Sequence, residues 1–90
     1  MKNLTFTVDH KDWTQVTKAT ARKLYNAGSE IMICAANMRP GGPWKPEVII
    51  DKAYLQDTDR DPDFDKYVNA FTYYNCTPET GSYPRFYKAI

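Results

Sequence analysis

The sequence predicts one α+β domain over residues 1–90, with a four-stranded antiparallel sheet covered on one face by two helices. Three observations lead to this class: short apolar segments typical of strands, two longer segments with apolar residues at helical spacing, and Pro- and Gly-rich breaks between them. The expected order is strand, helix, strand, strand, helix, strand, which is the ferredoxin-like split βαβ arrangement.

The first strand is expected at LTFTVD, residues 4–9, because apolar residues alternate with threonines there. The first helix is expected to follow directly, with Asp9 as its N-cap and Gly28 as its C-terminal stop. The residues that recur at helical spacing between these two are Trp13, Val16, Thr17, Thr20 and Leu24.

The second and third strands are expected at EIMICAAN, residues 30–37, and EVIID, residues 47–51. Both faces of the segment 30–37 are apolar, so we expect another part of the chain or a second copy to cover its outer face. The segment between them, residues 38–46, holds three Pro and two Gly and is expected to be an irregular loop.

The second helix is expected from Asp63 to about Asn75, with Asp61 as its cap and Pro62 at the first helical position. Its apolar residues at the i, i+3, i+4, i+7 spacing are Phe64, Tyr67, Val68, Phe71 and Tyr74. RFYKA, residues 85–89, is expected to form the final strand.

Charge and composition exclude several classes of protein. The net charge is only +1, with seven Lys/Arg and three Asp/Glu in residues 1–45 and five against eight in residues 46–90, so direct nucleic-acid binding is not expected. There is no apolar run long enough to span a membrane and no signal-like N-terminus, which favours a cytoplasmic location. Cys34 and Cys76 match no zinc pattern and are expected to be buried, reduced thiols.

The segment DTDRDPDFD carries an aspartate at every second position: Asp57, Asp59, Asp61, Asp63 and Asp65. Alternating carboxylates are typical of calcium loops, but an EF-hand loop that began at Asp57 would need Gly and Glu where the chain has Pro62 and Val68. We therefore expect neither a metal site nor a cofactor.

Two interpretations of this acidic segment stay open. Capping and the helix dipole account for Asp61, Asp63 and Asp65, but not for Asp57 and Asp59, which precede the helix. Alternatively, in an extended segment alternate carboxylates lie about 6–7 Å apart, similar to the phosphates of a nucleic-acid strand. Such a segment could occupy a Lys/Arg-lined groove on a partner protein as a nucleic-acid mimic.

Aromatic residues and an arginine complete the candidate partner-binding set. Trp44 and Arg39 lie in the Pro/Gly-rich loop, and both residue types dominate binding energy at interfaces, although Trp44 could instead fold back over the sheet edge. Tyr73 and Tyr74 are adjacent on the second helix, so both cannot point into the core and at least one is expected to be exposed.

Catalysis is not expected. His10 is the only histidine, and no phosphate-binding, dinucleotide-binding or metalloprotease motif occurs. A thiol enzyme that uses Cys34 or Cys76 is an alternative without a local motif.

Taken together, the small size, the segment DTDRDPDFD, Trp44 and the tyrosines resemble the small phage and mobile-element proteins that block host defences, anti-CRISPR proteins among them. The resemblance implies an inhibitor that binds a host protein or ribonucleoprotein through a basic surface. The alternative is a homo-oligomeric accessory protein of a phage or mobile element, in which the apolar outer face of residues 30–37 pairs with a second copy.

Overall fold

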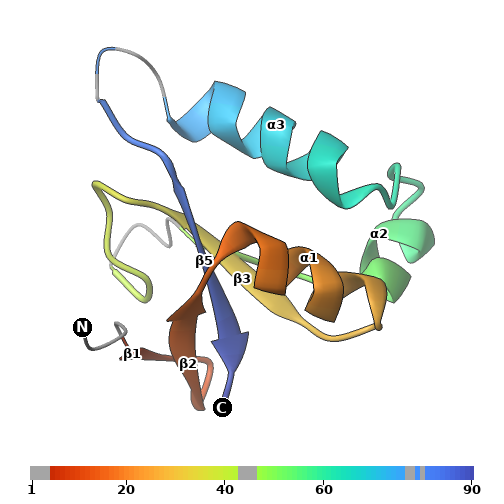
Figure 1. Ribbon diagram of the computed structural model, residues 1–90, viewed down its shortest axis with the longest axis horizontal. Helices are drawn as coiled ribbons and strands as arrows, with labels where there is room; N and C mark the ends of the chain where they lie inside the picture. The colour runs from red at the N-terminus through yellow and green to blue at the C-terminus, as the bar shows by residue number, and fades with distance from the viewer. Residues whose placement is uncertain (1–4, 43–46, 77–78, 80) are drawn as a thin grey trace.

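The computed structural model describes residues 5–42, 47–76, 79 and 81–90. In chain order its elements are β1 (Thr5–Val8), β2 (Lys11–Val16), α1 (Lys18–Asn26), β3 (Ile31–Ala35), β4 (Val48–Ile50), α2 (Lys52–Asp57), α3 (Phe64–Asn75) and β5 (Pro84–Ala89) (Figure 1). The α+β class is confirmed.

The sheet has five strands in the order β1-β2-β5-β3-β4, and every neighbouring pair is antiparallel. The expected four strands and the ferredoxin-like order are therefore not confirmed. The last strand, β5, lies in the middle of the sheet between β2 and β3, so these two strands run parallel to each other and α1 connects them.

The largest correction concerns the segment between residues 9 and 17. Asp9 does not cap a helix; Asp9 and His10 form a two-residue turn with φ of 52° and 64°, and Val8 pairs with Lys11 across it. Positive φ at both central residues is typical of a type I′ hairpin, whose twist matches that of the two strands. The helix starts later, with Thr17 as its N-cap.

The physical reason for this error lies in the spacing of Trp13 and Val16. Two apolar residues three positions apart share one face of a helix, but they point to opposite faces of a strand. Both faces of this sheet are apolar, so a strand buries Trp13 on one face and packs Val16 against the other. The indole Nε1 of Trp13 then donates to the Val8 carbonyl oxygen at 3.2 Å.

The described residues form two apolar clusters, one on each face of the sheet. All three helices contribute to the larger cluster, through residues such as Tyr25, Leu55 and Phe64, so the helices lie on one face. On the other face Met32 and Cys34 of β3 are fully buried against neighbouring side chains that include Trp13. The expectation that another part of the chain covers the outer face of β3 is confirmed.

A short helix, α2, lies between β4 and α3, where the expected order of elements contains none. The Asp51 carboxylate caps it by accepting a hydrogen bond from the Tyr54 N–H at 2.7 Å, and Leu55 is buried in the larger cluster. The cap stabilises the start of α2, and the buried Leu55 packs the helix against the domain.

We expect His10→Gly to raise the free energy of unfolding by about 0.5–1 kcal/mol, because glycine removes the steric cost of positive φ in the turn. His10→Val should lower the free energy of unfolding, because a β-branched side chain tolerates positive φ poorly. Urea denaturation of the two variants beside the parent protein measures both changes. A His10→Gly protein no more stable than the parent would contradict the type I′ turn.

Candidate partner-binding surface

The start of α3 is held against α1 by a buried tyrosine. The side chain of Tyr25 is fully buried, and its hydroxyl donates to the Pro62 carbonyl oxygen at 2.6 Å. Its ring also packs against Phe64, with 5.4 Å between the ring centroids. These two contacts determine where the acidic segment lies relative to the rest of the domain.

Two aspartates of that segment are used by the first turn of α3. The Asp63 carboxylate accepts a hydrogen bond from the Lys66 N–H at 2.9 Å, so Asp63 is the N-cap, rather than Asp61 as expected. Asp61 accepts from the Asp63 N–H at 3.0 Å and from the Lys66 ammonium at 2.9 Å. The hydrogen bond from the Lys66 ammonium, followed by that from the Asp63 N–H, lowers the pKa of Asp61.

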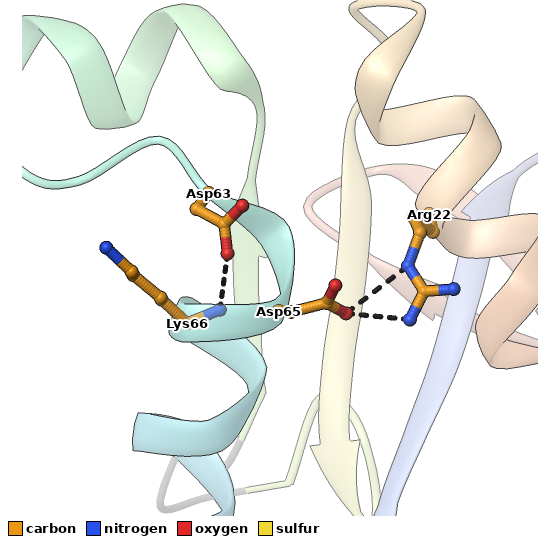
Figure 2. Close-up of polar contacts among 4 residues, drawn as sticks. All are labelled: Arg22, Asp63, Asp65 and Lys66. Carbon is orange, nitrogen blue, oxygen red and sulfur yellow. Dashed lines mark hydrogen bonds and ion pairs between the residues drawn. The ribbon is translucent and has the colours of Figure 1, made fainter.

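Asp65 is paired with an arginine from another helix. One of its carboxylate oxygens accepts hydrogen bonds from Arg22 Nη2 at 2.7 Å and from Nε at 3.2 Å (Figure 2). The same guanidinium lies 5.9 Å from the centroid of the Phe64 ring. The sequence offered no local signal for this pair, because Arg22 and Asp65 are 43 residues apart.

The other two aspartates are free within the part of the chain that the structure describes. Asp57 is the last residue of α2 and Asp59 has a left-handed φ of 56°; both are exposed, and neither side chain makes a hydrogen bond or ion pair with a described residue. The segment is therefore not extended throughout. The even carboxylate spacing expected for a nucleic-acid mimic is wrong for residues 57–59, because α2 and the turn after it shorten the rise per residue.

Over the described residues, no group of three or more His, Cys, Asp or Glu side chains is placed to hold a metal ion. The ammonium of Lys66 and the guanidinium of Arg22 occupy positions beside Asp61 and Asp65 that a cation would otherwise take.

Tyr73 and Tyr74 are exposed together on the last turns of α3. Their exposed fractions are 76% and 77%, and their rings meet edge to face with 5.1 Å between centroids. The expectation that at least one of them is exposed is confirmed. Tyr54 on α2, whose exposure no sequence pattern indicates, is half exposed as well.

The loop residues do not join the acidic segment. The guanidinium of Arg39 lies 5.9 Å from the centroid of the Phe6 ring in β1, at the end of the domain away from α2 and the start of α3 (Figure 1). Trp44 lies outside the described residues.

Neither cysteine has the character of an activated nucleophile. Burial raises the pKa of the Cys34 thiol to about 11, with the charge of Glu47 as the next cause, and burial also raises the pKa of Cys76. A catalytic thiolate needs the opposite shift. The two thiols belong to the clusters on opposite faces of the sheet, and His10 is exposed in the β1–β2 turn.

The Asp61–Lys66 pair predicts a pH effect. Because the pKa of Asp61 is lowered by folding, its contribution to stability is present above its unfolded pKa of about 3.9 and is lost as the pH falls through the folded value. In an NMR titration the Asp61 carboxyl should titrate below its usual range in the parent and closer to that range in Lys66→Gln. The control Lys88→Gln, on β5, should leave the midpoint unchanged; a midpoint that Lys66→Gln does not move would contradict the pairing.

The Cys34 thiol should react with iodoacetamide at pH 8 far more slowly in the folded protein than in urea, because it is buried and protonated. Mass spectrometry of peptides after timed quenching separates it from Cys76. Fast alkylation of Cys34 in the folded state would favour a reactive thiol.

Comparison of the chain with family models, with curated proteins and with solved structures finds no match. Separately, no helix among the described residues is long and apolar enough to cross a membrane.

Proposed function

We propose that this chain is a non-catalytic binding protein that occludes a basic, nucleic-acid-binding surface of a partner protein, with an anti-CRISPR protein as the specific form. One observation carries the proposal: Tyr73 and Tyr74 are exposed side by side on the helix whose start follows the free carboxylates of Asp57 and Asp59. The fold itself uses none of these four side chains in its core.

The free aspartates and the tyrosines have different roles in this proposal. Uncompensated carboxylates attract a Lys/Arg-rich surface over a distance and orient it, which mainly raises the association rate. The tyrosines are exposed in the free protein, and their rings would be buried when the partner binds. This aromatic contact, together with hydrogen bonds from the hydroxyls, mainly slows dissociation. Asp61 and Asp65 contribute less, because Lys66 and Arg22 already balance their charges.

The length of α3 defines the size of the partner surface. The 12 residues of α3 rise about 18 Å, and this length sets the scale of the separation between the aspartates before the helix and the tyrosines on its last turns. A partner that contacts both ends must therefore offer a basic patch and an apolar recess separated by a distance of that order, which is compatible with an interface of standard size.

The homo-oligomeric alternative loses the observation on which it rested. Met32 and Cys34, whose apolar face was expected to pair with a second copy, are fully buried within the single chain. No other observation favours self-association through that face of the sheet.

The proposal is tested by competition with DNA for purified CRISPR effector complexes. The parent protein should prevent binding of a fluorescent target DNA, and Asp57→Asn/Asp59→Asn should raise the half-inhibitory concentration by about tenfold or more at low salt. The matched control is Asp61→Asn/Asp65→Asn, which makes the same change in net charge but removes carboxylates that are already paired; it should raise that concentration by much less.

Thermal melting of both double variants shows whether stability contributes to the result, and Asp57→Asn/Asp59→Asn should melt like the parent. Equal loss of inhibition in the two double variants would refute the role of the free aspartates. A parent protein that never competes with DNA would refute the anti-CRISPR form.

A further inference from the structure

A groove of about 580 Å³ runs along the edge strand β1 at the end of the domain away from α2. Residues 5–7 of β1 form one wall, and residues 39–42 form the other. We propose that this groove binds an extended peptide segment with an acidic side chain, which adds to β1 as a sixth strand. This site is separate from the acidic segment and does not depend on the function proposed above.

The strand register shows which main-chain groups are available at this edge. Val8 and Lys11 flank a two-residue turn and form a hydrogen-bonded pair, and so do Phe6 and Trp13 two residues on. The alternate residues, Thr5 and Thr7, therefore direct their N–H and C=O groups away from β2, toward the open edge. Both threonines are exposed. An added strand would pair with these groups, as in other cases of β-strand addition.

The loop opposite β1 comes close to the strand at Gly41. Gly41 has a φ of 78°, and a Cβ there would lie 3.4 Å from the Thr7 carbonyl oxygen and 3.5 Å from a Val8 methyl group. A Cβ at these distances would make ordinary van der Waals contact, so the positive φ is what favours glycine here, and the loop closes the groove at its Thr7 end. Pro40 beside it is buried, which anchors this wall.

The charge of the groove selects an acidic segment. Arg39 is the one charged residue among those that line the groove, and within the described chain it makes a cation–π contact with Phe6 but no ion pair. A guanidinium held over an aromatic ring keeps its donors free for a carboxylate, with which it forms strong, charge-assisted hydrogen bonds.

Two carboxylates of the chain itself, Glu47 and Asp12, lie near the groove. Glu47 Oε1 accepts from the Gly41 N–H at 3.3 Å, while Glu47 Oε2 is buried and makes no hydrogen bond within the described chain. Asp12 accepts from the Thr7 hydroxyl at 2.7 Å. Because Thr7 and Asp12 point to the face of the hairpin opposite Phe6 and Trp13, Asp12 does not lie on the side of Arg39.

The dimensions give the length of the ligand. The three residues of β1 that line the groove, Thr5 to Thr7, span about 10 Å, so about three residues of an extended partner can pair with them. The acidic side chain has to point to the face that carries Phe6, where Arg39 lies.

The probe is the peptide acetyl-Thr-Val-Glu-Val-Thr-amide, titrated into ¹⁵N-labelled protein and followed by NMR. The amide signals of Thr5 and Thr7 should move, and those of α3 should not. Arg39→Gln should weaken binding by about fivefold or more, to the level of the matched peptide with Gln in place of Glu. The control Lys18→Gln makes the same charge change on α1 and should leave the affinity unchanged.

The main-chain part of the proposal has its own test. Thr5→Pro removes one outward N–H without removing a hydrogen bond to β2, and it should weaken binding about fivefold or more. A probe peptide methylated on alternate backbone nitrogens should lose binding to the parent protein, and this test leaves the fold untouched. Equal binding of the methylated peptide, equal binding of the Glu and Gln peptides, or signal changes confined to other elements would overturn the proposal.

Discussion

The hydrogen bond from the buried Tyr25 hydroxyl to the Pro62 carbonyl oxygen is the contact on which the placement of the acidic segment depends. It joins α1 to the residue before the cap of α3, where the chain would otherwise turn freely between two helices. Burial, and then the nearby charges of Asp51 and Asp63, raise the pKa of Tyr25, so the hydroxyl keeps its proton and remains a donor. The first turn of α3 is therefore positioned by the core rather than by its own surface charges.

This anchoring divides the aspartates into two groups. The carboxylates at and after the anchored turn meet cations or N–H groups of the chain itself, as Asp65 meets Arg22 and Asp61 meets Lys66. Asp57 and Asp59 precede the anchor and remain in solvent. Exposed ion pairs add little to stability, so their main effect is to cancel charge at Asp61 and Asp65. Asp63 is held by a backbone N–H as the cap of α3, which leaves Asp57 and Asp59 as the two aspartates of the segment that make no hydrogen bond or ion pair in the described chain.

Elements whose apolar residues fit only one kind of spacing were predicted correctly from the sequence. Elements whose apolar residues fit both helical and strand spacing were missed. α3 was predicted well because Phe64, Val68 and Phe71 repeat at helical spacing. β2 was missed because its apolar residues fit a helix equally well, and because the Asp9–His10 turn lacks the glycine typical of type I′ turns. The Arg22–Asp65 pair could not be predicted, since it forms only after distant helices pack.

The central claim is that Asp57 and Asp59 are available to a cationic partner, whereas Asp61 and Asp65 are ion-paired and Asp63 is held as the cap of α3. The most direct measurement is a carbon-detected NMR titration of the protein with deca-arginine, which follows all five carboxyl signals in one spectrum. The account predicts that the carboxyl signals of Asp57 and Asp59 move first and furthest, while those of Asp61, Asp63 and Asp65 stay nearly still. Equal movement of all five, or movement only at the residues paired with Lys66 and Arg22, would contradict it.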